Sequence, residues 1–206
     1  VCGTKYLGVH RDENLKFKEH VEYVSSKLVK LKVAFYYMSS FIDKESAMKI
    51  YYAYVFPYIR YGIEVYGVCN ITTMNRLQTL QNSLLKILLK KSRLYSTNML
   101  YSELNVLKIA DIHNSFVTTF VYKQHNRILP TIFENYYRMN QNVRTRCTRQ
   151  NNDIHIPRFR TTGGQKSLKY VGAKLWNSLS ENIRSEKSVS VFRKSLNAML
   201  ISKYNV

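Results

Sequence analysis

The sequence is poor in acidic residues, cysteine and proline, and each shortage narrows the possible functions. Its 206 residues contain 13 Asp and Glu, three Cys, three Pro and seven Gly. The cysteines at positions 2, 69 and 147 are far apart, and they form no CxxC pair and have no His at ligand spacing. This pattern argues against a zinc knuckle and against a disulfide framework. It favours a reducing, intracellular compartment.

Long hydrophobic runs are also missing. The most apolar stretch, Leu84 to Leu89, is far shorter than the ~20 residues that a membrane-spanning helix needs, and lysines flank it. We therefore expect no membrane partner. The chain starts without Met and without a charged-then-apolar leader, in a segment with the pattern of a strand. We accordingly expect it to be a piece of a longer protein.

Familiar catalytic constellations are absent as well. Metal-dependent phosphoryl transfer needs carboxylates that converge on cations. The close acidic pairs are Asp12-Glu13, in a polar turn, and Asp43 with Glu45, at a helix start. The Gly-Gly pair at 163–164 lacks the surrounding pattern of a phosphate-binding loop. We expect no catalytic residue, metal ion or other cofactor in this chain, and no small-molecule substrate.

Positive charge is what the sequence has in excess. It contains 32 Lys and Arg, which gives a net charge of +19. Residues 142–206 alone carry 13 basic and 3 acidic side chains, so the excess is concentrated towards the C-terminus. Cationic side chains release counterions when they contact phosphates, so a nucleic acid is the expected partner. A membrane surface or an acidic protein is the competing interpretation.

Apolar residues recur at steps of three and four along much of the chain, which predicts a mainly α fold. We expect a strand at 5–9 that returns at 15–17, a break or kink at Pro57, a further strand at 154–160 and a turn at 161–164. Helices are expected from residue 20, from Asp43, from Thr72 or Thr73, and over 98–104, 108–127, the later part of 167–179, and 188–203. The expected organisation is a β-hairpin (1–19), a helical bundle (20–138), a basic linker or arm (139–165) and a basic C-terminal helical unit (166–206).

Two kinds of cluster have competing interpretations. Seven aromatic residues between Tyr51 and Tyr66 could stack on bases or pack around Pro57, and packing is favoured. Trp176, between Leu175 and Leu179, is expected in the core. Basic residues gather at 27–32, at 86–93 and at 144–149, and each cluster alone is compatible with a solvated surface. The three together, with the net charge, favour contact with phosphates.

An ordered set of short motifs resembles non-LTR retrotransposon reverse transcriptases of the jockey-like, LINE type. The motifs are spread over nearly the whole chain: TKYLGV (4–9), LKFKEH (15–20), IYYAYVFPYIRYG (50–62), LQTLQN (77–82), LYSEL (100–104), IADI (109–112), PRFRT (157–161) and GAKLWN (172–177). A tryptophan usual in the family appears here as Tyr66, before Gly67.

The resemblance implies the thumb and C-terminal region of such an enzyme, which clamps an RNA–DNA hybrid or template–primer duplex. Tyr6-Leu7-Gly8 corresponds to the primer-grip turn. The catalytic Tyr/Phe-x-Asp-Asp segment precedes this turn in the family and is not in this chain, so Mg²⁺ belongs only to a full-length parent polymerase, and this chain alone is expected to be inactive. Nuclear residence is a further implication of the family.

The residues expected to contact nucleic acid combine that turn with basic side chains: Tyr6, Leu7, Gly8, Lys27, Lys30, Lys32, Lys86, Lys90, Arg144, Arg146, Arg158, Arg160 and Lys166. The alternative function is a repurposed or non-functional remnant that acts as a helical protein-interaction module.

Overall fold

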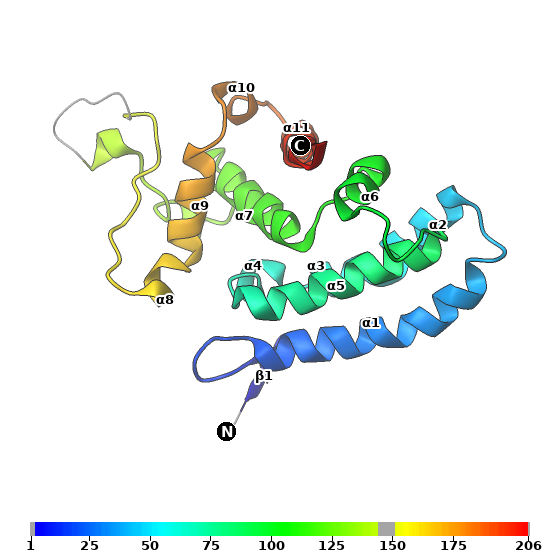
Figure 1. Ribbon diagram of the computed structural model, residues 1–206. Coiled ribbons are helices and arrows are strands. Elements are labelled where there is room, and N and C mark those ends of the chain that lie inside the picture. Colours follow the sequence, from blue (N-terminus) through cyan, green and yellow to red (C-terminus); the bar gives the residue numbers. More distant parts are fainter. Residues whose placement is uncertain (1–2, 144–150, 206) are drawn as a thin grey trace. The chain divides into compact units, whose positions relative to one another are not determined.

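The computed structural model describes residues 3–143 and 151–205. These residues form a mainly helical chain with a short antiparallel hairpin at its N-terminal end, which confirms the expected fold class (Figure 1). Two of the expected contact residues, Arg144 and Arg146, lie outside the described residues. Along the described part, no helix combines the length and the apolarity needed to cross a membrane.

The elements follow one another in the order β1 (Thr4–Tyr6), β2 (Val9–Arg11), α1 (Lys18–Met38), α2 (Lys44–Ile50), η1 (Tyr51–Val55), α3 (Phe56–Arg60), α4 (Ile63–Tyr66), α5 (Ile71–Leu88), α6 (Thr97–Leu104), α7 (Ile109–His125), η2 (Thr131–Phe133), η3 (Asn140–Asn142), α8 (Thr162–Gln165), α9 (Leu168–Asn177), α10 (Glu181–Arg184), α11 (Val189–Ser202) and η4 (Lys203–Asn205). They form two compact units, Val1–Ile112 with Ile201–Val206, and His113–Leu200. This division follows packing, whereas the expected boundaries near 19, 138 and 165 follow composition and stay a prediction.

The N-terminal hairpin turns earlier than the sequence pattern predicted. Thr4 pairs with Arg11 and Tyr6 with Val9, so Leu7-Gly8 is a two-residue turn. Both turn residues have positive φ, 44° and 81°, as a type I′ turn requires. The expected return at 15–17 is wrong, because Gly8 adopts this conformation without steric cost and reverses the chain first.

Helices α1 and α5 lie side by side in the first unit (Figure 1). Each helix has an apolar face. Helix α5 begins after Asn70, so the cap expected at Thr72 or Thr73 is wrong by two residues or more. Leu80 and Ile87, which recur at helical spacing with Leu77 and Leu84, are only half-buried. The buried residues are His20, Val21, Val24, Leu28 and Phe35 on α1, and Leu77, Gln81, Leu84, Leu85 and Leu88 on α5.

The helix that Asp43 caps continues through Pro57. The Asp43 carboxylate accepts a hydrogen bond from the backbone N–H of Glu45 at 3.2 Å, as a helix cap does. A break or kink was expected at Pro57; the helix is not broken there, because the π-helical segment η1 joins α2 to α3. There the N–H of Phe56 donates to the carbonyl of Tyr51, five residues back. A proline lacks an N–H and crowds the carbonyl four residues before it, and a wider turn relieves both conflicts.

The second unit has an aromatic core. Trp176 is 2% exposed, as expected, and its ring centroid lies 6.2 Å from that of Phe192, which in turn stacks on Tyr122 at 4.2 Å. The expected strand at 154–160 is wrong beyond one isolated bridge between Met139 and Ile154.

At Ile154, hydrogen bonds from a side chain take the place of the expected strand pairing. The Asn177 side chain bonds both the N–H and the carbonyl of Ile154, at 2.9 and 2.8 Å, and so takes the place of a neighbouring strand. The expected turn at 161–164 is instead the start of α8, whose cap is Thr161. The Thr161 hydroxyl accepts a hydrogen bond from the N–H of Gly164 at 3.2 Å.

Candidate nucleic-acid interface

The tip of the hairpin projects into solvent. Tyr6 is 72% exposed and Leu7 73% exposed, although both are large and partly apolar. The backbone of the turn is nevertheless held in place, because the hydroxyl of Tyr61 donates a hydrogen bond to the carbonyl of Leu7. Gly8 permits this approach, since a Cβ at that position would lie 3.0 Å from the Tyr61 ring. The structure therefore joins two motifs that are more than fifty residues apart in sequence.

Two lysines flank the ring of Tyr23 beside this hairpin. The Nζ atom of Lys5, on β1, lies 5.8 Å from the ring centroid, and the Nζ atom of Lys27, on α1, lies 5.4 Å from it. Both distances fall within cation–π range. We call Lys5 and Lys27 the cation pair. Lys27 is an expected contact residue, whereas sequence reasoning missed Lys5, because a single lysine in a short strand belongs to no basic cluster.

A pocket lies next to the cation pair. It has a volume of about 300 Å³, and we call it the hairpin pocket. Its lining comes from the hairpin turn, from the first turns of α1 and from α3 with the residue that follows it: Gly8, His20, Tyr23, Val24, Pro57, Tyr58 and Tyr61. Three of these residues belong to the aromatic segment 51–66, for which base stacking and core packing were both considered.

That aromatic segment divides between the two interpretations. Tyr51 and Tyr66 are fully buried and belong to the core. Tyr58 and Tyr61 are 40% and 56% exposed and line the hairpin pocket. A helical stretch with a row of buried residues on one side necessarily turns its other aromatics outward.

His20 is a buried residue in the lining of the hairpin pocket. It is 2% exposed, and its ring lies 4.8 Å from the Tyr66 ring, edge to face. Burial, with a smaller contribution from the charge of nearby His10, lowers the pKa of His20 to about 4. The backbone N–H of His10 donates to Nδ1 of His20 at 3.5 Å, which leaves the proton of the neutral ring on Nε2. Within the described residues, this Nε2 atom has no hydrogen-bond partner.

The other lysines of α1 do not form one patch. Lys30 lies three residues after Lys27, so the two share a side of the helix, and Lys30 is exposed. Lys32 is half-buried and follows Lys27 by five residues, which turns it to a different side.

The basic cluster at 86–93, at the end of α5 and just beyond it, bonds to its own loop and to two other segments of the first unit. Lys86 donates to the carbonyl of Arg93 at 2.8 Å, and Lys90 donates to the carbonyl of Ser40 at 3.4 Å. Lys91 forms an ion pair with Glu103 at 3.3 Å. Bonds to backbone carbonyls restrict Lys86 and Lys90 but leave their charge in place.

The expected basic residues of the second unit lie on irregular chain. Arg158 and Arg160 are exposed and alternate with the half-buried Pro157 and Phe159. Lys166 is exposed at the end of α8. The structure thus presents these three side chains on the surface of the second unit and gathers Tyr6, Leu7, Gly8 and Lys27 in the first.

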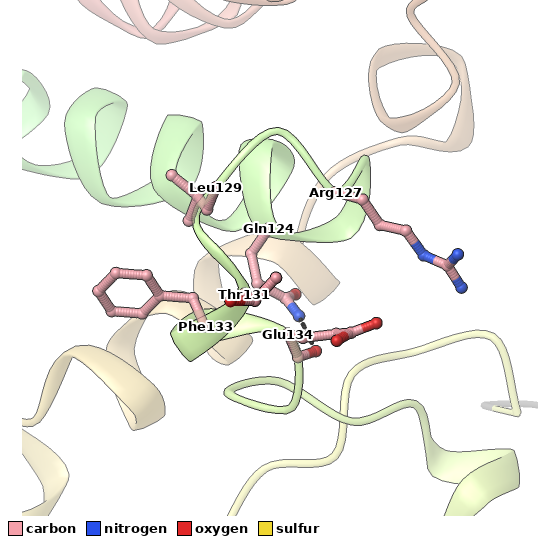
Figure 2. A pocket seen from close by; sticks show the side chains of 6 residues that line it. All are labelled: Gln124, Arg127, Leu129, Thr131, Phe133 and Glu134. Atoms are coloured by element: carbon pink, nitrogen blue, oxygen red, sulfur yellow. Dashed lines mark hydrogen bonds between the residues drawn. The ribbon is translucent and has the colours of Figure 1, made fainter.

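A second pocket lies in the turn after α7 (Figure 2). Figure 2 shows the six side chains of its lining, with Phe133 on one side and the guanidinium of Arg127 directed away from it. The amide of Gln124 donates to the carbonyl of Glu134 at 2.8 Å, a hydrogen bond between two residues of the lining. The pocket's volume of about 210 Å³ is below the roughly 300–1,000 Å³ of ligand pockets.

In the part of the chain that the structure describes, no three His, Cys, Asp or Glu side chains come together as metal ligands would. Comparison of the chain with protein-family models, with curated proteins and with solved structures found no match.

Proposed function

We propose that the chain is the thumb and C-terminal portion of a non-LTR retrotransposon reverse transcriptase and binds template–primer nucleic acid. The binding is electrostatic and independent of sequence, with Lys and Arg contacting phosphates. The hairpin turn Tyr6-Leu7-Gly8 contacts the end of the primer strand. The chain alone does not polymerise, because the catalytic carboxylates of the family belong to the palm.

The cation pair beside the exposed hairpin tip is the observation that carries this proposal. It brings one lysine from strand β1 and one from helix α1 to the same aromatic ring. Both ammonium groups lie near the same ring, and an anion bound at that ring is attracted by both of them. Phosphate groups supply that anion on any nucleic acid, and the net charge of +19 favours the same partner.

The test is the salt dependence of binding to a labelled RNA–DNA hybrid, followed by fluorescence anisotropy. A complex with about four phosphate contacts loses on the order of 100-fold in affinity between about 50 and 200 mM salt. An affinity that stays constant over this range would overturn the proposal.

Two double variants of equal charge test whether the cation pair accounts for the salt dependence of binding. Lys5→Gln with Lys27→Gln should lower the slope of log affinity against log salt by about 2. Lys44→Gln with Lys49→Gln removes the same charge from α2, where both lysines already pair with carboxylates of Glu103 and Glu45. This control should change the slope by less than half as much, and equal changes would refute the assignment to the cation pair.

A helical protein-interaction module is the second candidate function, and the C-terminal half of α1 favours it. Val29, Val33, Tyr36 and Tyr37 recur on one side of that helix and are 49–68% exposed, and Phe41 just beyond is 90% exposed. A contiguous apolar surface of this kind marks an interface. Hybrid binding that is weak and insensitive to salt, together with self-association that Val33→Asp abolishes, would favour this function over the first.

A further inference from the structure

The hairpin pocket has an aromatic lining, and two positively charged side chains lie beside it. Its lining contains three tyrosines, Tyr23, Tyr58 and Tyr61, together with Gly8, His20, Val24 and Pro57. The cation pair stands outside the lining, over Tyr23. A ligand that suits this arrangement has a planar ring for the pocket and a negative charge for its edge.

The pocket itself carries no fixed positive charge. His20 is the titratable base in its lining, and burial keeps that ring neutral near pH 7. A neutral aromatic interior therefore favours an uncharged ring, while the ammonium groups of Lys5 and Lys27 favour an anion beside it. A nucleotide combines both properties, because its base is a neutral planar ring and its phosphate is anionic.

We infer that the hairpin pocket binds the base of a single unpaired nucleotide, with the adjoining phosphate held by Lys5 and Lys27. Stacking on aromatic side chains is tolerant of sequence, since every base has a π face. The volume of about 300 Å³ is at the low end for ligand pockets and matches one nucleoside better than a base pair. This inference rests on the proposed function, because it places one nucleotide of the bound strand.

The position of the pocket decides which nucleotide it receives. Gly8 is both a residue of the lining and the second residue of the turn assigned to the primer end. A base that is still paired is covered by its neighbours in the stack and cannot enter a pocket between tyrosines. The base therefore comes from an unpaired strand end, such as a one-nucleotide overhang.

The experiment compares hybrids that differ only at one strand end. One hybrid is blunt, one carries a single unpaired 2-aminopurine nucleotide, and one carries an abasic nucleotide at the same place. The overhang with a base should bind about fivefold or more tighter than the abasic one, the lower end of what one stacked base contributes. The 2-aminopurine fluorescence should fall on binding, because stacking on tyrosine quenches it.

Variants locate the base. Tyr58→Ala should remove the preference for a base over an abasic site, and Tyr58→Phe should keep it, because the ring and not the hydroxyl stacks. Tyr54→Ala is the matched control: Tyr54 lies in the same helical stretch, is 56% exposed and does not line the pocket. Loss of the preference in both alanine variants would overturn the inference.

The outcomes separate the two proposals. Absence of binding to all three hybrids contradicts the proposed function itself. Salt-dependent binding that is equal for the blunt, abasic and base-carrying ends leaves the proposed function standing and overturns the pocket. Adenosine monophosphate is then added as a competitor to the complex with the 2-aminopurine overhang. If the free nucleotide restores the fluorescence, the pocket binds mononucleotides. If the fluorescence stays quenched, the pocket requires a nucleotide at a strand end.

Discussion

Leu7 occupies a position that suits it poorly. Its φ of 44° is left-handed, which costs an ordinary L-residue roughly 1–2 kcal/mol, and its side chain is 73% exposed. Neither burial nor backbone preference accounts for a leucine there. Strained residues of this kind are concentrated at functional sites. Contact with a bound nucleic-acid strand would explain a leucine at this position, which the stability of the fold does not.

Replacing Leu7 with asparagine tests this conflict. Asn-Gly is the preferred pair for a type I′ turn, so Leu7→Asn should raise the free energy of unfolding by about 0.5–1 kcal/mol. The same change should weaken hybrid binding. Urea denaturation and anisotropy measure the two effects. Leu94, which is 93% exposed in another loop, provides the control: Leu94→Asn should leave hybrid binding unchanged.

His20 makes stability depend on pH. Its pKa is about 4 in the folded chain and near 6.5 when exposed, so between these values the unfolded chain binds more protons. Stability is therefore complete above about pH 6.5 and falls by roughly 3 kcal/mol as the pH drops to 4. The groups around the ring are His10, Tyr23 and Tyr66.

The decisive comparison is with His20→Phe, which keeps the ring and removes the titration. Burial also lowers the pKa of His113 and His125, so both proteins lose stability in acid. The wild type should lose more, and thermal unfolding from pH 7 to 4.5 measures the difference. Parallel curves would contradict this assignment.

Helix α5 places a polar side chain in the middle of its apolar face. Gln81 is fully buried, and its amide donates to the hydroxyl of Tyr51 at 2.8 Å and to the carbonyl of Leu107 at 3.1 Å. It thus connects α5 to the helical stretch containing Tyr51 and to the segment before α7. Without the amide, the buried hydroxyl of Tyr51 and the carbonyl of Leu107 would lose these bonds.

Gln81→Leu should accordingly lower the free energy of unfolding by about 2–4 kcal/mol, although leucine is more apolar and of similar size. Thr79→Ala, on the exposed side of the same helix, should change it by less than about 0.5 kcal/mol. Chemical denaturation measures both values. A stabilising effect of Gln81→Leu would show that the amide is dispensable.

Local pattern predicted the helices well and the hairpin poorly. Spacing alone placed α1, α6 and α11 close to their observed bounds, because burial along one side follows the helical period. The turn at Leu7-Gly8 was missed, since leucine is rare in a left-handed position and the polar segment at 11–14 was the stronger turn signal.

The candidate site depended on long-range contacts, which periodicity does not contain. Tyr61 reaches Leu7 across 54 positions, and Lys5 lies at the same tyrosine ring as Lys27 because the hairpin packs on α1. Lys27 was predicted from its cluster, but Lys5, Tyr23 and His20 were not. No local signal distinguishes an exposed tyrosine that lines a pocket from one that does not, as Tyr58 and Tyr54 illustrate.

The first unit needs both ends of the chain. Residues 201–206 belong to it, and Tyr204 is 7% exposed within it. The Tyr204 hydroxyl donates to the carboxylate of Asp111 and accepts from the backbone N–H of Lys108 at 3.0 Å. Its ring lies 6.2 Å from that of Tyr101 on α6. The C-terminal residues thus complete the packing around α6.

Tyr204→Ala should therefore destabilise the first unit by about 3 kcal/mol, through lost packing and an unpaired N–H. Hydrogen exchange should accelerate in α6, far from the substituted residue in sequence. Lys203→Ala, at the exposed neighbouring position, is the control and should leave exchange in α6 unchanged. Protection of α6 that persists in Tyr204→Ala would contradict this dependence.

The π-helical turn before Pro57 also constrains how this chain can vary. Ala47, Tyr51, Val55 and Ile59 are buried at steps of four residues. In a regular α-helix each such step advances about 40° beyond a full turn, so the row would drift off the packed side. The wider turn of η1 holds more residues and brings the row back.

Chain length in this segment is consequently fixed more strictly than residue type. Exposed positions such as Ala53 can change their side chain without moving a neighbour. Loss of one residue from η1 would instead rotate Tyr58 and Tyr61 by about 100° relative to the row before them and turn both away from Gly8. Among related sequences, substitutions should be common between Tyr51 and Val55, and insertions or deletions there should be absent wherever the proline is retained.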